Sequence, residues 1–129
     1  MKLTRFDPRD SEAMAALLDL YFSWGHPESC PTPEELPSTG YIVPGKAAVF
    51  LYSTDSSLAT LEHAITMRDA EGHTEAIHAI CDALIADAKA AGFTKLYVYC
   101  GNQHAVRRAL AVGFGLSLNA ERWQLEMRL

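Results

Sequence analysis

The amino-acid sequence predicts a mixed α/β (α+β) fold, in which a central sheet carries helices on both faces. Segments of helical periodicity alternate with short runs of β-prone residues, and the expected order is β-α-β-β-β-α-β-α-β. The strand–helix–strand unit at 58–100 requires two parallel strands, whereas the three consecutive strands that begin at 39 favour antiparallel pairing. With 129 residues, 49% of them hydrophobic, the chain is expected to form one domain, 1–129, around a core.

The first part of the chain predicts a short strand, one helix and a stiff loop. Residues 2–7 favour a short strand, with Leu3 and Arg5 on one side and Thr4 and Phe6 on the other. Ser11 is a candidate N-cap for a helix that ends near Ser23, because apolar residues recur at helical spacing and Gly25 follows. The loop 26–38 holds four of the six prolines, and proline restricts the backbone.

The remaining residues predict most of the sheet and two more helices. Strands are expected at 39–43, 46–54, 58–67, 93–100 and 122–129, with a short one near Leu116–Leu118. Helices are expected at 74–91, where Gly92 ends the helix, and at 102–112, where Gly113 does so. Apolar residues alternate along the last strand, which at a sheet edge would allow pairing across a dimer. A monomer and a homodimer therefore both agree with the sequence.

Composition and charge argue against several classes of partner. The net charge is −5, and such a surface repels nucleic-acid phosphates and anionic membranes. The three cysteines are odd in number and lack metal-ligand spacing, so we expect no disulfide framework, no metal site and a reducing cytoplasmic location. The chain shows neither a signal peptide at its beginning nor an apolar run long enough to span a membrane. We therefore expect no nucleic-acid and no membrane partner.

The segment that follows the buried strand 93–100 carries the most informative motif. Asn102-x-x-Ala105 followed by Gly113-Phe114 is similar to the N-x-x-A-x-x-x-Y-x-x-x-G-F segment of the GNAT superfamily of N-acetyltransferases. Residues 50–59 also resemble a hairpin of small GNAT-like proteins, including ones carried by bacteriophages. The motifs cover a minor part of the chain, whereas the order of elements resembles the family over nearly all of it.

The resemblance implies that acetyl-CoA binds in a V-shaped gap between the fourth and fifth strands. The fourth strand would pair with the pantetheine arm, and free N–H groups at the start of the next helix would hold the pyrophosphate. Glu62 would be the general base, with His63 behind it, and N–H groups near Ala64–Thr66 would hold the oxyanion. The implied cofactor-binding residues are Ala64, Ile65, Thr66, Met67, Gly72, His73, Thr74, Glu75, Ala76, Asn102 and Ala105.

Two positions depart from the family pattern. The family's phosphate loop reads R/Q-x-x-G-x-G/A, whereas the candidate registers here begin with Asp69 or Glu71. A carboxylate near pyrophosphate weakens binding, which Arg68 and His73 would partly offset. Ala109 stands where many members have a tyrosine that protonates the departing CoA thiolate.

Two functions follow from this resemblance. The first is an acetyl-CoA-dependent N-acetyltransferase that acts on an amine of a small molecule or of a protein. The alternative is a catalytically impaired GNAT scaffold that binds a protein partner, such as a host enzyme if the gene is phage-borne. The degenerate phosphate loop favours the alternative, and the Asn102 segment favours the enzyme.

The candidate residues also have purely structural interpretations. A glutamate on a half-exposed strand is commonly solvated, and a histidine on an apolar face is commonly an interior residue. These interpretations apply to Glu62 as a solvated residue, His63 as an interior histidine, Cys100 as a small buried hydrophobic residue, and Glu75, His78 and Asp82 as a solvated helix face rather than a metal site.

Overall fold

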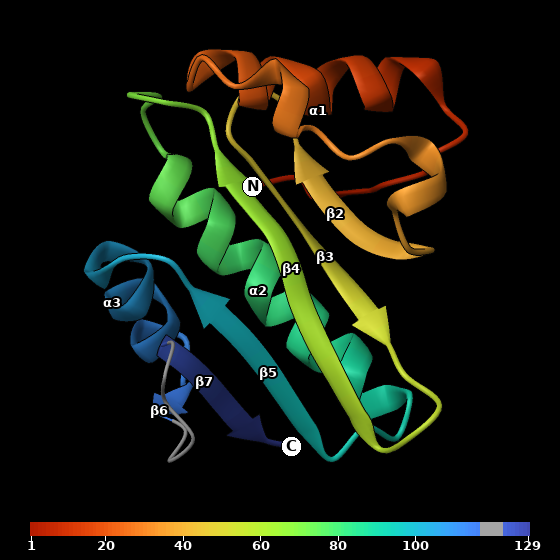
Figure 1. Ribbon diagram of the computed structural model, residues 1–129, viewed down its shortest axis with the longest axis vertical. Helices are drawn as coiled ribbons and strands as arrows, with labels where there is room; N and C mark the ends of the chain where they lie inside the picture. The colour runs from red at the N-terminus through yellow and green to blue at the C-terminus, as the bar shows by residue number, and fades with distance from the viewer. Residues whose placement is uncertain (117–122) are drawn as a thin grey trace.

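A computed structural model describes residues 1–116 and 123–129 and shows one seven-stranded mixed sheet (Figure 1). The strand order is β1-β2-β3-β4-β5-β7-β6, and among these strands only β4 and β5 pair in parallel. The strands are β1 (Thr4–Arg5), β2 (Thr39–Val43), β3 (Ala47–Ser53), β4 (Leu58–Thr66), β5 (Lys95–Cys100), β6 (Gly115–Leu116) and β7 (Trp123–Arg128). The predicted fold class and element order are confirmed.

Helices cover both faces of this sheet. They are α1 (Ser11–Ser23), α2 (His73–Ala90) and α3 (Gln103–Ala111), with 3-10 turns at Pro27–Ser29 and Pro33–Glu35 in the proline-rich loop. Figure 1 shows α1 across one end of the sheet and α2 running behind it. No helix in the described part of the chain has the length and apolar composition needed to cross a membrane.

The side chains of β3 alternate between two hydrophobic cores, which places the helices on opposite faces. Ala48 and Phe50 pack with α1, whereas Val49 and Leu51 pack with α2 and α3. Phe50 is fully buried and meets Phe6 edge-to-face, with ring centroids 5.1 Å apart. Because both faces of β3 are buried, its sequence is apolar almost throughout.

Two expectations about the ends of elements are wrong. Asp10, not Ser11, is the N-cap of α1, and its carboxylate accepts from the Glu12 N–H at 2.9 Å. The first strand is limited to two residues, Thr4 and Arg5. The last strand does not lie at a sheet edge, because β7 pairs with β5 on one side and with β6 on the other.

The short strand expected near 116–118 is β6, and it begins one residue earlier, at Gly115. Positions 117 and 118 lie outside the described residues, as does 122, the expected start of the last strand.

Candidate active site

The sheet opens between its two parallel strands. β4 and β5 pair in register from Leu58 with Lys95 to Leu61 with Val98, and the pairing ends there. Beyond that point β5 continues to pair with β7, and β4 continues to pair with β3. The edge of β4 from Glu62 to Thr66 therefore faces a gap instead of a strand.

A β-bulge in β4 accounts for the opening. Ala48 pairs with Ile65 and Phe50 pairs with Glu62, so β4 has one residue more than β3 over this interval. His63, at the bulge, has a φ of 53°, in the left-handed region that non-glycine residues rarely adopt. A bulge bends its strand and increases the local twist, which turns β4 away from β5.

Strand alternation decides which backbone groups of β4 face the gap. The Met67 N–H donates to the Lys46 carbonyl at 2.8 Å, so the backbone groups of Met67 and Ile65 face β3. Those of Ala64 and Thr66 consequently face the gap. The Thr66 carbonyl there accepts a 2.6 Å hydrogen bond from the Trp24 indole. Of the predicted pantetheine partners, Ala64 and Thr66 offer backbone groups. Ile65 and Met67 line a cavity along this edge and pack against the α1 core.

The N-terminus of α2 lies at the end of this edge. Gly72, with a φ of 78°, is the N-cap, and no hydrogen bond is made by the N–H groups of Thr74 and Glu75 within the described residues. Free N–H groups and the positive end of the helix dipole favour an anion. The Ala76 N–H differs, because it already donates to the Gly72 carbonyl at 3.0 Å. The predicted phosphate donors therefore exclude Ala76.

Charged side chains of both signs surround the loop 67–72 and determine the electrostatic potential beside the N-terminus of α2. Lys46, from the turn between β2 and β3, donates from Nζ to the Glu71 carbonyl beside Gly72. The exposed Asp69 carboxylate lies 3.7 Å from the Arg68 guanidinium. Arg68 and His73 were the predicted sources of offsetting positive charge, and Lys46 is a source that was not predicted. The Lys46 contact had no signal in sequence spacing, because it depends on how the β2–β3 turn packs.

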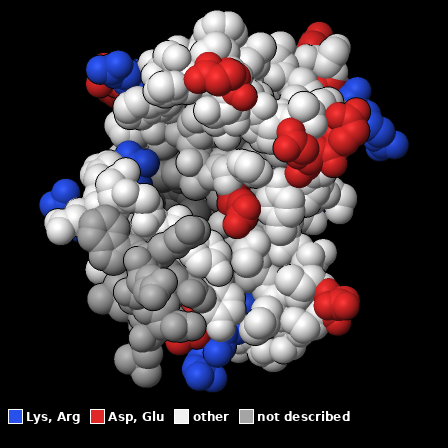
Figure 2. Space-filling model, in the orientation of Figure 1, with Lys and Arg blue, Asp and Glu red and all other residues white. Residues whose placement is uncertain are grey.

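Two cavities meet along the gap. The inner one measures about 370 Å³ and lies between β4, β5, α2 and α3, whereas the outer one measures about 330 Å³ and follows β4 from Ala64 to Met67 and on to His73. Figure 2 shows this face of the molecule hollowed near its centre, with acidic side chains beside and above the hollow. The residues that line both cavities are Ala64, Asn102, Ala105 and Arg108.

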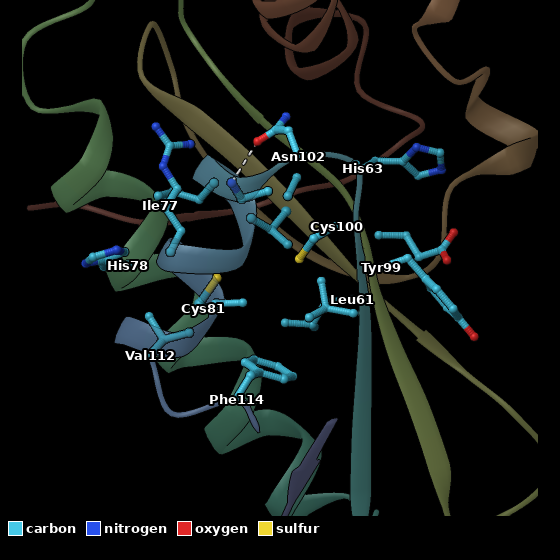
Figure 3. A pocket seen from close by; sticks show the side chains of 18 residues that line it. Leu61, His63, Ile77, His78, Cys81, Tyr99, Cys100, Asn102, Val112 and Phe114 are labelled. Carbon is cyan, nitrogen blue, oxygen red and sulfur yellow. Dashed lines mark hydrogen bonds between the residues drawn. The ribbon is translucent and has the colours of Figure 1, made fainter. Parts of the chain in front are cut away.

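Asn102 and Ala105 are joined by a hydrogen bond at the meeting point of the cavities (Figure 3). The Asn102 side-chain oxygen accepts from the Ala105 N–H at 2.9 Å and so caps α3. That bond uses one lone pair of the oxygen, so the amide NH₂ of Asn102 and the second lone pair remain for a ligand. Both predicted residues therefore lie in the site, and Asn102 has a structural role there as well.

Glu62 and His63 lie at the mouth of the inner cavity, on the α1 side of the sheet. Glu62 pairs across the ladder with Phe50 and is half-buried. The His63 ring contacts the rings of Tyr52 and Phe50, with centroids 5.7 and 6.4 Å apart, and points away from the cavity in Figure 3. Tyr99 lines the same mouth and is 53% exposed. Tyr99 was not predicted as a site residue, because its only signal in the sequence was its place at the end of a buried strand.

The inner wall of this cavity holds two neutral thiols. Burial raises the pKa of Cys81 to about 12, with Asp82 adding to the rise and Arg108 opposing it, and burial also raises the pKa of Cys100. Both sulfur atoms point into the cavity in Figure 3. Cys100 is 8% exposed, so its interpretation as a small buried hydrophobic residue is confirmed.

His78 and Arg108 also line the inner cavity. The expectation of a solvated face is wrong for His78, which is half-buried and whose Nε2 atom has no hydrogen-bond partner in the described structure. The Arg108 Nε atom is buried and likewise unpartnered there, and burial lowers the pKa of its guanidinium. No group of three or more His, Cys, Asp or Glu residues able to hold a metal ion occurs among the residues described.

We predict that the Cys81 thiol makes folding less favourable at alkaline pH. Its pKa is about 12 in the folded chain against an ordinary value of 9.0, so the folded state holds this proton more tightly. The resulting stability is complete below pH 9 and is lost as the pH rises toward 12, at about 1.4 kcal/mol per pH unit at most. Urea unfolding at pH 7.5 and 10.5 measures the loss, which Cys81→Ala should reduce. An equal loss in the variant would contradict the assignment.

Solved structures share this fold over nearly the whole chain. Aminoglycoside 6′-acetyltransferase type Ii superimposes with a TM-score of 0.74 at 14% identity, over 98% of this chain and 95% of its own. A GCN5-related N-acetyltransferase from Kribbella flavida superimposes with a TM-score of 0.69 at 16% identity, over 98% of each chain. The ribosomal-protein-S18-alanine N-acetyltransferase from Escherichia coli matches with a TM-score of 0.67 and 12% identity, over 99% of this chain and 92% of its own.

The chain therefore has the fold of the GNAT N-acetyltransferases, as the sequence motifs predicted. At the level of sequence, no family model and no curated protein matches it.

Proposed function

We propose that this protein is an acetyl-CoA-dependent N-acetyltransferase. The observation that carries the proposal is the end of the β4–β5 pairing at Leu61 and Val98, which leaves the edge of β4 free between a helix N-terminus and a cavity. A strand edge can pair with the amide groups of pantetheine, and the helix N-terminus can hold a pyrophosphate. The GNAT fold of the chain supports the same function.

The residues present fit a CoA thioester. Ala64 and Thr66 would pair with the arm in the outer cavity, and the free N–H groups of Thr74 and Glu75 would bind the phosphates with Lys46 beside them. The thioester supplies an activated acyl group. Ala64 lines both cavities, and its N–H would polarise the acyl carbonyl and stabilise negative charge on that oxygen.

Glu62 is the proposed general base. Its side chain lies on the α1 side of the sheet, at the mouth of the inner cavity, so an amine arriving from that side would meet both the carboxylate and the thioester. An amine attacks only when it is uncharged, and removal of its proton by a nearby carboxylate favours the attack. The acceptor is an amine of a small molecule or of a protein.

We predict that acetyl-CoA and CoA raise the melting temperature of the purified protein. A ligand that binds only the folded state at 100 times its Kd stabilises by about 2.7 kcal/mol, which amounts to several degrees. Lys46→Met should weaken CoA several-fold by removing a cation from the phosphate loop, but should leave acetyl-pantetheine, which has no phosphate, unchanged. Lys89→Met, at the other end of α2, is the matched control.

A partner-binding scaffold is the second candidate function. Trp24 already occupies the Thr66 carbonyl on the edge that would receive pantetheine, and Asp69 lines the outer cavity. Both features reduce the affinity expected for CoA. No thermal shift at millimolar acetyl-CoA and CoA would refute the enzyme and favour the scaffold.

A further inference from the structure

We propose that the acyl group of the preferred donor is larger than acetyl, namely an apolar chain of about six carbons. The inference rests on the proposed function as a CoA-dependent acyl transfer, keeps acetyl-CoA as a weaker donor, and concerns the inner cavity of the same site. This cavity lies beyond Ala64, where the thioester would be held, and extends away from the outer cavity that would receive the pantetheine arm. If the arm occupies the outer cavity, as proposed above, the inner one remains for the acyl group.

The volume of the inner cavity exceeds what an acetyl group can fill. It measures about 370 Å³. A cavity of roughly 150 Å³ lined by aliphatic side chains is large enough to bind benzene, which has six carbons. Part of this volume is the mouth beside Glu62, His63 and Tyr99, where the amine would enter. An acetyl group adds one methyl to its carbonyl and would leave the deep part of the cavity empty.

The deep part of the cavity has the chemistry of an acyl-chain pocket. Its wall comes from the last paired rung of β4 and β5, from the inward face of α2 and from α3 with the residues just after it. The thiols in this wall are neutral at pH 7, because burial raises the pKa of both. Figure 3 shows several of these side chains around one space. The apolar residues are Leu61, Val98, Ile77, Cys81, Cys100, Ala109, Val112 and Phe114.

Small side chains on α3 create the space. Ala105 and Ala109 lie one helical turn apart and both line the cavity, so α3 places only methyl groups opposite α2 at these positions. Ala109 is 7% exposed, and a larger side chain there would project into the cavity. Arg108 lines both cavities, and its buried unpartnered Nε is available to a ligand carbonyl at the boundary.

Burial of apolar carbon should appear directly in the affinity. Each methylene moved from water into an apolar site is worth about fourfold in the binding constant. Hexanoyl-CoA has four more methylenes than acetyl-CoA. Part of that gain is lost because the acyl chain becomes ordered on binding. We still expect hexanoyl-CoA to bind at least about tenfold more tightly than acetyl-CoA.

Calorimetric titration with CoA, acetyl-CoA and hexanoyl-CoA tests the proposal, using the wild-type protein and two leucine variants. Ala109→Leu fills the pocket and should reduce the preference for hexanoyl-CoA to below about threefold, with the affinity for acetyl-CoA changed less than twofold. Ala111→Leu makes the same change at an exposed position of α3 and should keep the wild-type preference. Val112→Phe fills the cavity from another position, should Ala109→Leu not fold.

The outcomes separate this inference from the proposed function. Equal or weaker binding of hexanoyl-CoA to the wild-type protein overturns the inference but leaves an acetyltransferase. If both pocket-filling variants keep the preference for hexanoyl-CoA, the acyl chain binds outside the inner cavity, and the inference is again wrong. If CoA, acetyl-CoA and hexanoyl-CoA all fail to bind, both proposals are wrong.

Discussion

Glu62→Gln is expected to lower kcat by about 10²- to 10⁴-fold, the usual contribution of a positioned general base. Glutamine keeps the shape of the side chain and its hydrogen-bonding capacity but cannot accept the proton of the amine. Because the proposed partners of CoA are backbone groups, Lys46 and Asn102, the affinity for acetyl-CoA should change less than twofold. The measurement is steady-state turnover with a panel of amines, together with calorimetric binding of acetyl-CoA.

Glu126→Gln is the matched control for this prediction. Glu126 is also a half-buried glutamate of the sheet, on β7, but its carboxylate pairs with Lys95 at 3.2 Å, away from the gap. Loss of such a pair costs up to about 1 kcal/mol of stability and should leave kcat unchanged. If Glu62→Gln and Glu126→Gln turn over equally, Glu62 is not the base and is a solvated strand residue.

Gly40→Ala is expected to destabilise the fold by about 3 kcal/mol, at the upper end of the range for overpacking a core. A Cβ at Gly40 would lie 2.4 Å from Cδ1 and 2.9 Å from Cε1 of the Phe50 ring. Phe50 is 0% exposed and packs against Phe6, so the ring cannot yield without disturbing the α1 core. The shift in the urea midpoint at constant slope measures the effect.

Two further variants test this explanation. Gly115→Ala changes a glycine of another strand where an added Cβ meets nothing within 4 Å among the residues described, and it should alter stability by less than about 0.5 kcal/mol. Adding Phe50→Leu to Gly40→Ala should recover part of the loss, because the smaller side chain leaves room for the new methyl. If the two substitutions simply add, the clash between these two residues does not cause the destabilisation.

The helices and the buried strands follow directly from the sequence pattern. Apolar residues at helical spacing predicted α1 and α2, and the continuous apolar run of 96–98 predicted β5 as an interior strand, because these patterns report local burial. Asn102 was predicted as a site residue from its motif, and it lies at the junction of the two cavities. The first and last residues of helices and strands were predicted less accurately, since a cap such as Asp10 depends on side-chain geometry.

The face of each residue in β4 could not be predicted in the same way. Simple alternation placed Leu61, His63 and Ile65 on one face and Glu62 on the other. The bulge reverses the alternation of faces after Glu62. Leu61 therefore packs with α2, whereas Glu62 and Ile65 both lie on the α1 side of the sheet. The additional residue of β4 in its ladder with β3 cannot be recognised from the hydrophobic pattern of the sequence.

The sequence pattern alone therefore determined which segments are helices and strands and that the sheet is mixed, and the resemblance of its motifs implied a gap between β4 and β5. Only the tertiary structure decided which face each β4 residue occupies, the contact of Lys46 with the loop 67–72, and the size of the inner cavity. The reason is physical. Hydrophobic periodicity indicates whether each residue is buried, whereas a bulge, a hydrogen bond between distant segments and a cavity depend on how separate elements pack together.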